Sequence, residues 1–190
     1  MNSKRIILAA ALMTAASPAL AHTGSHTLSG FEAGFLHPLG GLDHALAMVT
    51  VGIIAALIGG RALWAVPASF VIMMVLGGVL GLAGVTVPAA ETGIAASLVV
   101  LGGIVAVGRS WSVGAATGLV GLFAVFHGYA HGVEMPAGAD TALYSLGFAL
   151  GSALLHGAGI TLGRIPFAQA RAARWAGLSV TLAGLVLAFG

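Results

Sequence analysis

Residues 62–84 read ALWAVPASFVIMMVLGGVLGLAG, a run of 23 residues without one charged side chain. An apolar stretch of about 20 residues is what an α-helix needs to cross the hydrocarbon core of a bilayer. Similar runs recur along most of the sequence, and only 6% of the 190 residues are charged, against about 25% in ordinary soluble domains. We therefore predict an all-α, polytopic membrane protein, and the composition excludes a water-soluble globule.

The apolar runs, punctuated by charges, glycines and prolines, predict a bundle of six transmembrane helices. Their expected bounds are 38–58, 62–84, 92–108, 112–132, 141–162 and 174–190. The chain has 30 glycines, roughly twice average usage, which is typical of transmembrane helices that pack closely. Glycine pairs at four-residue spacing predict helix contacts: Gly77 with Gly81, Gly114 with Gly118, Gly128 with Gly132, and Gly147 with Gly151.

The N-terminus predicts a cleavable signal peptide. Residues 1–5 are basic, residues 6–16 are apolar, and Ala19-Leu20-Ala21 has the A-x-A form of a signal-peptidase site. The alternative is an uncleaved anchor, but the apolar stretch is shorter than the roughly 17 residues of a span. The expected organisation is a signal peptide, 1–21, followed by a domain of six transmembrane helices, 22–190.

The remaining basic residues predict the orientation in the membrane. All fall in connections from an odd-numbered to an even-numbered span: Arg61, Arg109, Arg164, Arg171 and Arg174. The positive-inside rule places these connections in the cytoplasm and both termini outside. We expect a multi-pass protein of the bacterial inner membrane with periplasmic ends. Without the signal peptide the formal net charge is zero, so the basic pI does not indicate a nucleic-acid partner.

Two helix ends and one break are also predicted. Ser29 and Glu32 have the spacing of a capping box, so a helix begins near Gly30 and Glu32 is a cap rather than a ligand. Because a residue before proline disfavours the helical conformation, we expect a break at His37 and a span that starts near Pro38. Asp140 is expected to cap the fifth span.

The first group of ionisable side chains lies at the start of the first span. Residues 37–44 read HPLGGLDH, so His37 and His44 are seven residues apart and lie near one helical face. Asp43 adds a carboxylate beside His44. A carboxylate in this position either ligates a metal or fixes the tautomer of the neighbouring histidine, and both readings stay open.

The second group lies near the end of the fourth span. Residues 126–134 read FHGYAHGVE, and His127, His131 and Glu134 have i, i+4, i+7 spacing, which stacks them on one stripe of a helix. Glu134 is a ligand, a gate at the outer mouth or a simple interfacial carboxylate. Ionisable side chains within a membrane are costly and are functional candidates by default.

The opposite directions of the first and fourth spans place the two groups at matching depths. At about 1.5 Å per residue, His44 lies about 9 Å below Pro38 and His127 about 10 Å below Glu134. If the helices touch, imidazoles and carboxylates converge in the outer half of the membrane. Two carboxylates would neutralise a divalent cation, and without cysteine the donors suit Ni(II), Zn(II), Co(II) or Cu(II).

Three other histidines are weaker candidates. After cleavage His22 would present an imidazole and a free α-amine, a chelating pair for metal capture, with His26 nearby. The alternative for both is an ordinary polar tail. His156, in the fifth span, marks an exit path toward the cytoplasm or packs inside the bundle.

Both histidine segments resemble the HupE/UreJ family of bacterial nickel permeases, which are associated with hydrogenase and urease maturation. Residues 37–44 match the HPxxGxDH pattern and residues 126–134 match FHGxAHGxE, and the resemblance covers essentially the whole mature chain. It implies that Ni(II) is the transported substrate and that no organic cofactor is used. The residues implied in nickel binding are His37, Asp43, His44, His127, His131 and Glu134.

The histidines and carboxylates fit three classes of function. The leading hypothesis is a permease, not an enzyme, that imports Ni(II) or Co(II). Since the sequence holds no Walker motif, transport would follow a gradient or rely on trapping in the cytoplasm. The second is a membrane enzyme with a His-ligated di-iron or zinc site, although the chain has no HExxH motif. The third is a metal sensor or chaperone, or a proton path. The expected partners are the metal ion and the lipid bilayer, and homo-oligomer formation is left open.

Overall fold

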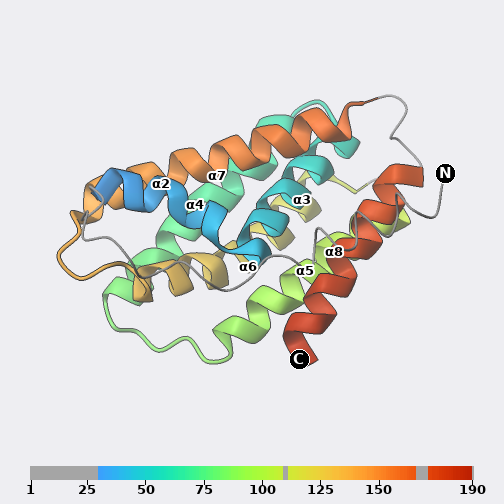
Figure 1. The fold of residues 1–190 in the computed structure, drawn as a ribbon. Helices are drawn as coiled ribbons and strands as arrows, with labels where there is room; N and C mark the ends of the chain where they lie inside the picture. Colours follow the sequence, from blue (N-terminus) through green and yellow to red (C-terminus); the bar gives the residue numbers. More distant parts are fainter. Residues whose placement is uncertain (1–29, 109–110, 166–170, 190) are drawn as a thin grey trace, which may run out of the picture.

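The computed structural model describes residues 30–108, 111–165 and 171–189. All regular structure within these ranges is α-helical, as predicted (Figure 1). In chain order the helices are α2 (Gly30–Gly40), α3 (Leu42–Ile58), α4 (Ala62–Leu82), α5 (Ala90–Val107), α6 (Val113–Val133), α7 (Thr141–Gly163) and α8 (Arg171–Phe189). The predicted signal peptide, 1–21, and His22 and His26 lie outside the described residues.

The helices have the length and composition of membrane spans. Each of the 5 helices α4 to α8 is long and apolar enough to cross a membrane, and α2 with α3 passes the same test as one broken span. Their bounds differ by no more than three residues from the predicted spans 62–84 to 174–190. The chain is therefore a multi-pass membrane protein.

The break in the first span lies at Gly41 and not at His37, where it was predicted. Pro38 lies inside α2, and the chain turns instead at Gly41, between two helices that meet at a bend of 81°. Pro38 is buried against Gly151 of α7, and this packing keeps α2 helical through the proline. Glycine is about 1 kcal/mol worse than alanine within a helix, so the consecutive residues Gly40 and Gly41 are the weaker point.

Helix α7 holds both arms of the bent span in place. It packs extensively against α2 and against α3, and Figure 1 shows α2 lying along the first half of α7. Gly147 and Gly151 contact the backbone of α2, while Gly159 contacts the backbone of α3. Side chains at these positions would collide with main-chain atoms, so glycine is what permits the close approach.

Helices α4 and α6 meet through glycines on both surfaces. Gly77 and Gly81 of α4 contact the backbone of α6, and Gly128 and Gly132 of α6 contact the backbone of α4. These contacts, with those of Gly147 and Gly151, confirm the predicted packing role of the corresponding pairs. Gly128 and Gly132 each follow a histidine, so packing of these glycines against α4 turns the histidines toward α3.

The contact predicted for Gly114 and Gly118 is not found among the described residues. A Cβ atom added at either position would meet no described atom within 4 Å. Four-residue spacing places two glycines on the same face of a helix, but it does not say whether another helix covers that face. Here the first turns of α6 have no described neighbour on the side of these glycines.

Side-chain caps fix the starts of α6 and α7. The backbone N–H of Leu143 donates to Asp140 Oδ1 over 2.9 Å, which confirms the predicted cap. Ser112 caps α6 in the same way through the N–H of Ala115, at 3.1 Å. Of the predicted capping box, Ser29 lies outside the described residues, while α2 begins at Gly30 as expected.

Candidate metal site

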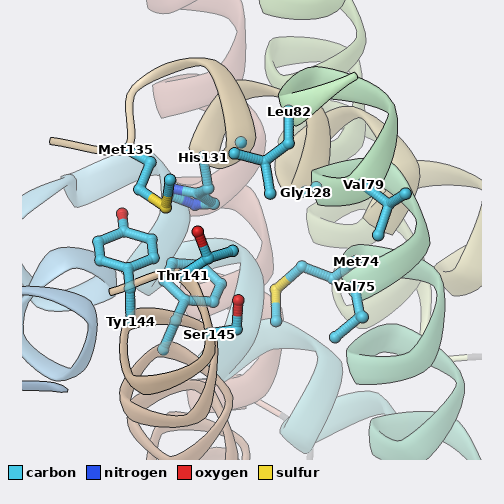
Figure 2. Close-up of a pocket in the computed structure, with 13 residues that line it drawn as sticks. Met74, Val75, Val79, Leu82, Gly128, His131, Met135, Thr141, Tyr144 and Ser145 are labelled. Carbon is cyan, nitrogen blue, oxygen red and sulfur yellow. The ribbon is translucent and has the colours of Figure 1, made fainter. Parts of the chain in front are cut away.

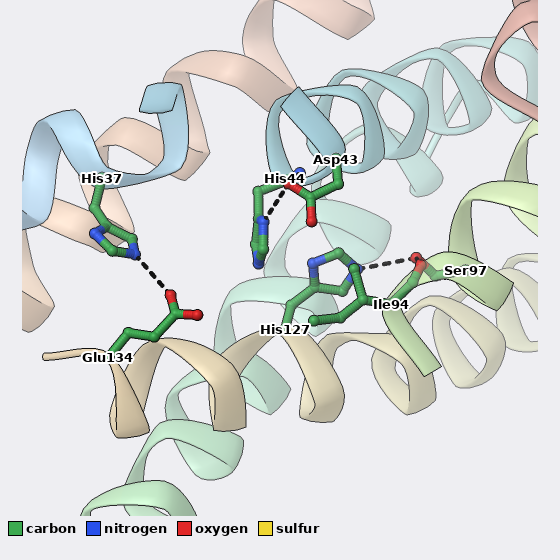
Figure 3. Close-up of polar contacts among 7 residues, drawn as sticks. All are labelled: His37, Asp43, His44, Ile94, Ser97, His127 and Glu134. Carbon is green, nitrogen blue, oxygen red and sulfur yellow. Dashed lines mark hydrogen bonds and ion pairs between the residues drawn. The ribbon is translucent and has the colours of Figure 1, made fainter. Parts of the chain in front are cut away.

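The structure brings the two histidine segments together. The end of α2 and the start of α3 face the last turns of α6, so that side chains from both segments point into one space (Figure 3). All the site residues predicted within these segments contribute to it: His37, Asp43, His44, His127, His131 and Glu134. They form two neighbouring groups, one at the mouth and one deeper in the bundle.

The outer group consists of His37, His131 and Glu134. His37 Nε2 lies 3.3 Å from Glu134 Oε2, and one donor atom from each of the three residues can be chosen so that all lie within 4.8 Å of one another. Glu134 is exposed, His37 is half-buried and His131 is buried. Two imidazoles and one carboxylate at this spacing can hold a divalent first-row metal ion.

The inner group consists of His44 and His127, with His131 shared between the two groups. The ring centroid of His44 lies 4.9 Å from that of His127 and 4.2 Å from that of His131. His131 also lies 4.7 Å from His37 in the outer group. His131 therefore links the mouth of the site to its buried part.

Asp43 contacts His44. Its Oδ1 atom lies 2.8 Å from His44 Nδ1 and accepts the backbone N–H of the same residue at 2.9 Å. A Cβ atom at Gly41 would lie 2.8 Å from this oxygen, so the glycine at the bend leaves room for the pair. The other ring nitrogen, His44 Nε2, is buried and has no hydrogen-bond partner among the described residues.

His127 is fully buried and is held from the side by α5. Its Nε2 atom lies 2.9 Å from Ser97 Oγ, and the Ser97 hydroxyl donates to the carbonyl of Ile94 over 2.6 Å (Figure 3). His127 Nδ1 has no partner in the described part of the chain. Sequence reasoning missed Ser97; the available signal was a hydroxyl within an apolar span, where polar side chains often bond across helices.

Several buried ring nitrogens in the described residues are unpartnered. Besides His44 Nε2 and His127 Nδ1, both nitrogens of His131 and both of His156 lack a hydrogen-bond partner. Most buried polar atoms in proteins are hydrogen-bonded, so such groups call for an explanation. The rings of His44, His127 and His131 lie next to one another, and unpartnered imidazole nitrogens in such a cluster are candidate metal ligands.

His156 lies apart from both groups, on α7. It is buried, and its ring centroid lies 5.1 Å from that of Phe70 on α4. Phe70 in turn lies 5.6 Å from His127, so one aromatic ring touches both histidines. The ring of Phe70 thus separates His156 from His127 of the inner group.

A cavity of about 120 Å³ opens beside His131, between α4, α6 and α7 (Figure 2). Its lining is mostly apolar and includes Met74, Phe148 and Tyr144. The Tyr144 ring also lies 5.9 Å from that of His37, and the Phe148 ring lies 4.1 Å from that of His131. The cavity thus lies beside the shared histidine, near the end of the bundle where α6 joins α7.

Comparison with known proteins assigns the chain to a family. A family model described as "HupE / UreJ protein" matches residues 10–187. The chain belongs to the HupE/UreJ family. Protein HupE of Rhizobium leguminosarum bv. viciae is 42% identical over 192 residues, covering 100% of both chains. No solved structure matches the chain. The two HupE/UreJ sequence patterns are the segments that meet at the site.

Proposed function

We propose that the protein is a permease that carries Ni(II) into the cell through the two histidine groups. The observation that carries this proposal is that the rings of His44 on α3 and His127 on α6 lie side by side in the bundle, each with a buried, unpartnered nitrogen. Membership of the HupE/UreJ family and the likeness to Protein HupE support it, because the family resemblance of both motifs implies nickel transport for hydrogenase or urease.

The donor atoms favour a borderline divalent cation. Nitrogen ligands from imidazoles and one carboxylate oxygen suit Ni(II), and Co(II) is the alternative substrate of the same chemistry. Asp43 and Glu134 together supply two negative charges near the site, which offsets the cost of placing a dication inside a membrane. Asp43 acts through His44 in this scheme, and Glu134 is a ligand at the mouth.

The direction of transport follows from the arginines. Arg61 precedes α4, Arg164 follows α7, and Arg171 begins α8. Figure 1 shows the connection from α3 to α4 at one end of the bundle and that from α6 to α7 at the other. With the arginine end in the cytoplasm of a bacterial inner membrane, Glu134 faces the outside and the ion enters there.

The remaining histidines extend this path at both ends. His22 and His26, in the N-terminal tail of the processed chain, would capture the metal before it reaches Glu134. His156 would receive the ion on the inner side of Phe70 and pass it toward the cytoplasm. Transport would follow the metal gradient, with trapping in the cytoplasm.

Uptake into proteoliposomes tests the proposal. The purified protein should accumulate Ni(II), with competition by Co(II) stronger than by Zn(II), and an imposed pH gradient would show whether protons are coupled. His44→Ala and His127→Ala should each abolish uptake while the protein still inserts. Thr161→Ala, on the far half of α7, removes a hydroxyl that bonds only within its own helix and serves as control.

The outcomes separate the competing classes. Uptake that is unchanged in both histidine variants would refute the permease. Iron or zinc bound at fixed stoichiometry, together with turnover of a lipid, would favour a membrane enzyme. Proton flux without any metal dependence would favour a proton path.

A further inference from the structure

We propose that Ser97 is a positioning residue that fixes the tautomer of His127 and so directs the lone pair of Nδ1 at the metal ion. Ser97 lies on α5, which supplies none of the metal-binding residues, and its side chain is fully buried. It contacts the site through His127 alone among the metal-binding residues of the described chain. The inference rests on the proposed function and adds to it which atom of His127 binds nickel.

The assignment follows from counting hydrogens. A serine hydroxyl has one hydrogen to donate and two lone pairs that accept. The hydroxyl of Ser97 donates to the carbonyl of Ile94 at 2.6 Å, so it can only accept at its second contact. The hydrogen in the 2.9 Å contact with His127 must then come from Nε2–H. In neutral imidazole the other nitrogen, Nδ1, carries the lone pair.

The same argument assigns the opposite tautomer to His44. The carboxylate of Asp43 can only accept, so at 2.8 Å it takes a hydrogen from His44 Nδ1 and leaves the lone pair on Nε2. Both assigned donor atoms, His44 Nε2 and His127 Nδ1, are buried and without a partner in the described structure. The inner group therefore binds metal through His44 Nε2 and His127 Nδ1. Asp43 sets the tautomer of the first histidine and Ser97 that of the second.

With both tautomers set, each histidine of the inner group offers one defined nitrogen to the ion. Histidines that ligate a metal usually donate their other N–H to a fixed acceptor, and loss of that acceptor costs about 10-fold to 100-fold in metal affinity or activity. Ser97 and Asp43 are those acceptors here. The ring centroid of His131 lies 4.2 Å from that of His44, and His131 would pass the ion inward from Glu134.

Two measurements on the reconstituted full-length protein test the role of Ser97. Nitrogen-15 NMR of the histidine rings should show His127 of the metal-free wild type protonated at Nε2. Ser97→Ala should shift the ring signals and raise the Ni(II) concentration for half-maximal uptake by about tenfold, with a smaller change in the maximal rate. Ser97→Thr keeps the hydroxyl and should restore the wild-type tautomer and affinity.

Ser152→Ala is the matched control. Ser152 is also fully buried, and its hydroxyl donates to a carbonyl of its own helix, that of Phe148, over 2.8 Å and forms no hydrogen bond with a histidine of the described chain. It should keep the wild-type affinity. His127 protonated at Nδ1, equal affinities of Ser97→Ala and Ser152→Ala, or an affinity loss in Ser97→Ala with an unchanged tautomer would each overturn the inference. Wild-type protein that takes up no Ni(II) would refute the proposed function, while the NMR assignment still decides the tautomer.

Discussion

His37 Nε2 lies 3.3 Å from Glu134 Oε2, although the two residues are 97 positions apart in the chain. The contact joins the last turn of α2 to the residue that follows α6, and His131 lies against both partners. The hydrogen bond between His37 and Glu134 can hold the two side chains in place without metal. When an ion binds, it takes the place of the hydrogen that they share. The outer group is thus assembled before the substrate arrives.

Coupling between His37 and Glu134 is the first prediction. His37→Ala and Glu134→Gln should each weaken Ni(II) binding by about tenfold, or about 1.4 kcal/mol. Because both residues would bind one ion, their effects should be non-additive by about 0.5–3 kcal/mol in a double-mutant cycle measured by calorimetry. Asp140→Asn removes a charge at the same end of the bundle and keeps a good cap, so its effect should add to that of His37→Ala. Additivity in both cycles would show that the outer group does not bind as a unit.

The glycines at the bend give the second prediction. Gly41→Ala places a Cβ atom 2.8 Å from Asp43 Oδ1 and 3.0 Å from His44 Nδ1, which must push the pair apart. Because Asp43 orients His44, we expect the affinity for Ni(II) to fall by about tenfold. Gly40→Ala meets no described atom within 4 Å and should bind as the wild type does. Equal affinities for the two variants would contradict the orienting role of Asp43.

Helix packing gives the third prediction. Gly128→Ala would drive a Cβ atom into the Met74 carbonyl and separate α4 from α6, which should destabilise the protein by about 1–3 kcal/mol. Gly118→Ala meets no described atom within 4 Å, so its stability should stay at or above that of the wild type, by up to about 1 kcal/mol. Thermal unfolding in detergent, followed by circular dichroism, measures both. A greater loss for Gly118→Ala would mean that a segment outside the described residues covers that face.

His156 gives the fourth prediction. His156→Phe keeps an aromatic ring beside Phe70 but removes both unpartnered nitrogens. If His156 receives the ion after the inner group, uptake should slow to about a tenth, which corresponds to about 1.4 kcal/mol of barrier, while equilibrium binding stays unchanged. Filter-based uptake and calorimetry on the same preparation separate the two quantities. A normal uptake rate would assign His156 to packing alone.

The match in depth between His44 and His127 was predicted from chain direction and rise per residue, although the break in the first span was placed wrongly. The two histidines still meet because α6 is unbroken, so the count of residues along it holds. Glycine contacts with α7 keep both arms of the bent span in place, which brings His44 to His127. Ser97 could not be found in this way. Its role depends on α5 lying beside α6, and no spacing within either segment encodes that contact.

The sequence by itself determined the membrane class, the spans and the two metal-binding segments, because apolar length and the helical repeat are local properties of the chain. It also placed His127 and His131 on one face and the neighbouring glycines on another. Only the tertiary structure decided which glycine pairs are covered, that the chain turns at Gly41, and that Asp43 and Ser97 stand behind His44 and His127. These features depend on which helices meet. In a membrane that choice rests on close backbone packing and buried hydrogen bonds between distant segments. The spacing of glycines marks faces that can pack closely, but it does not say which helix covers them.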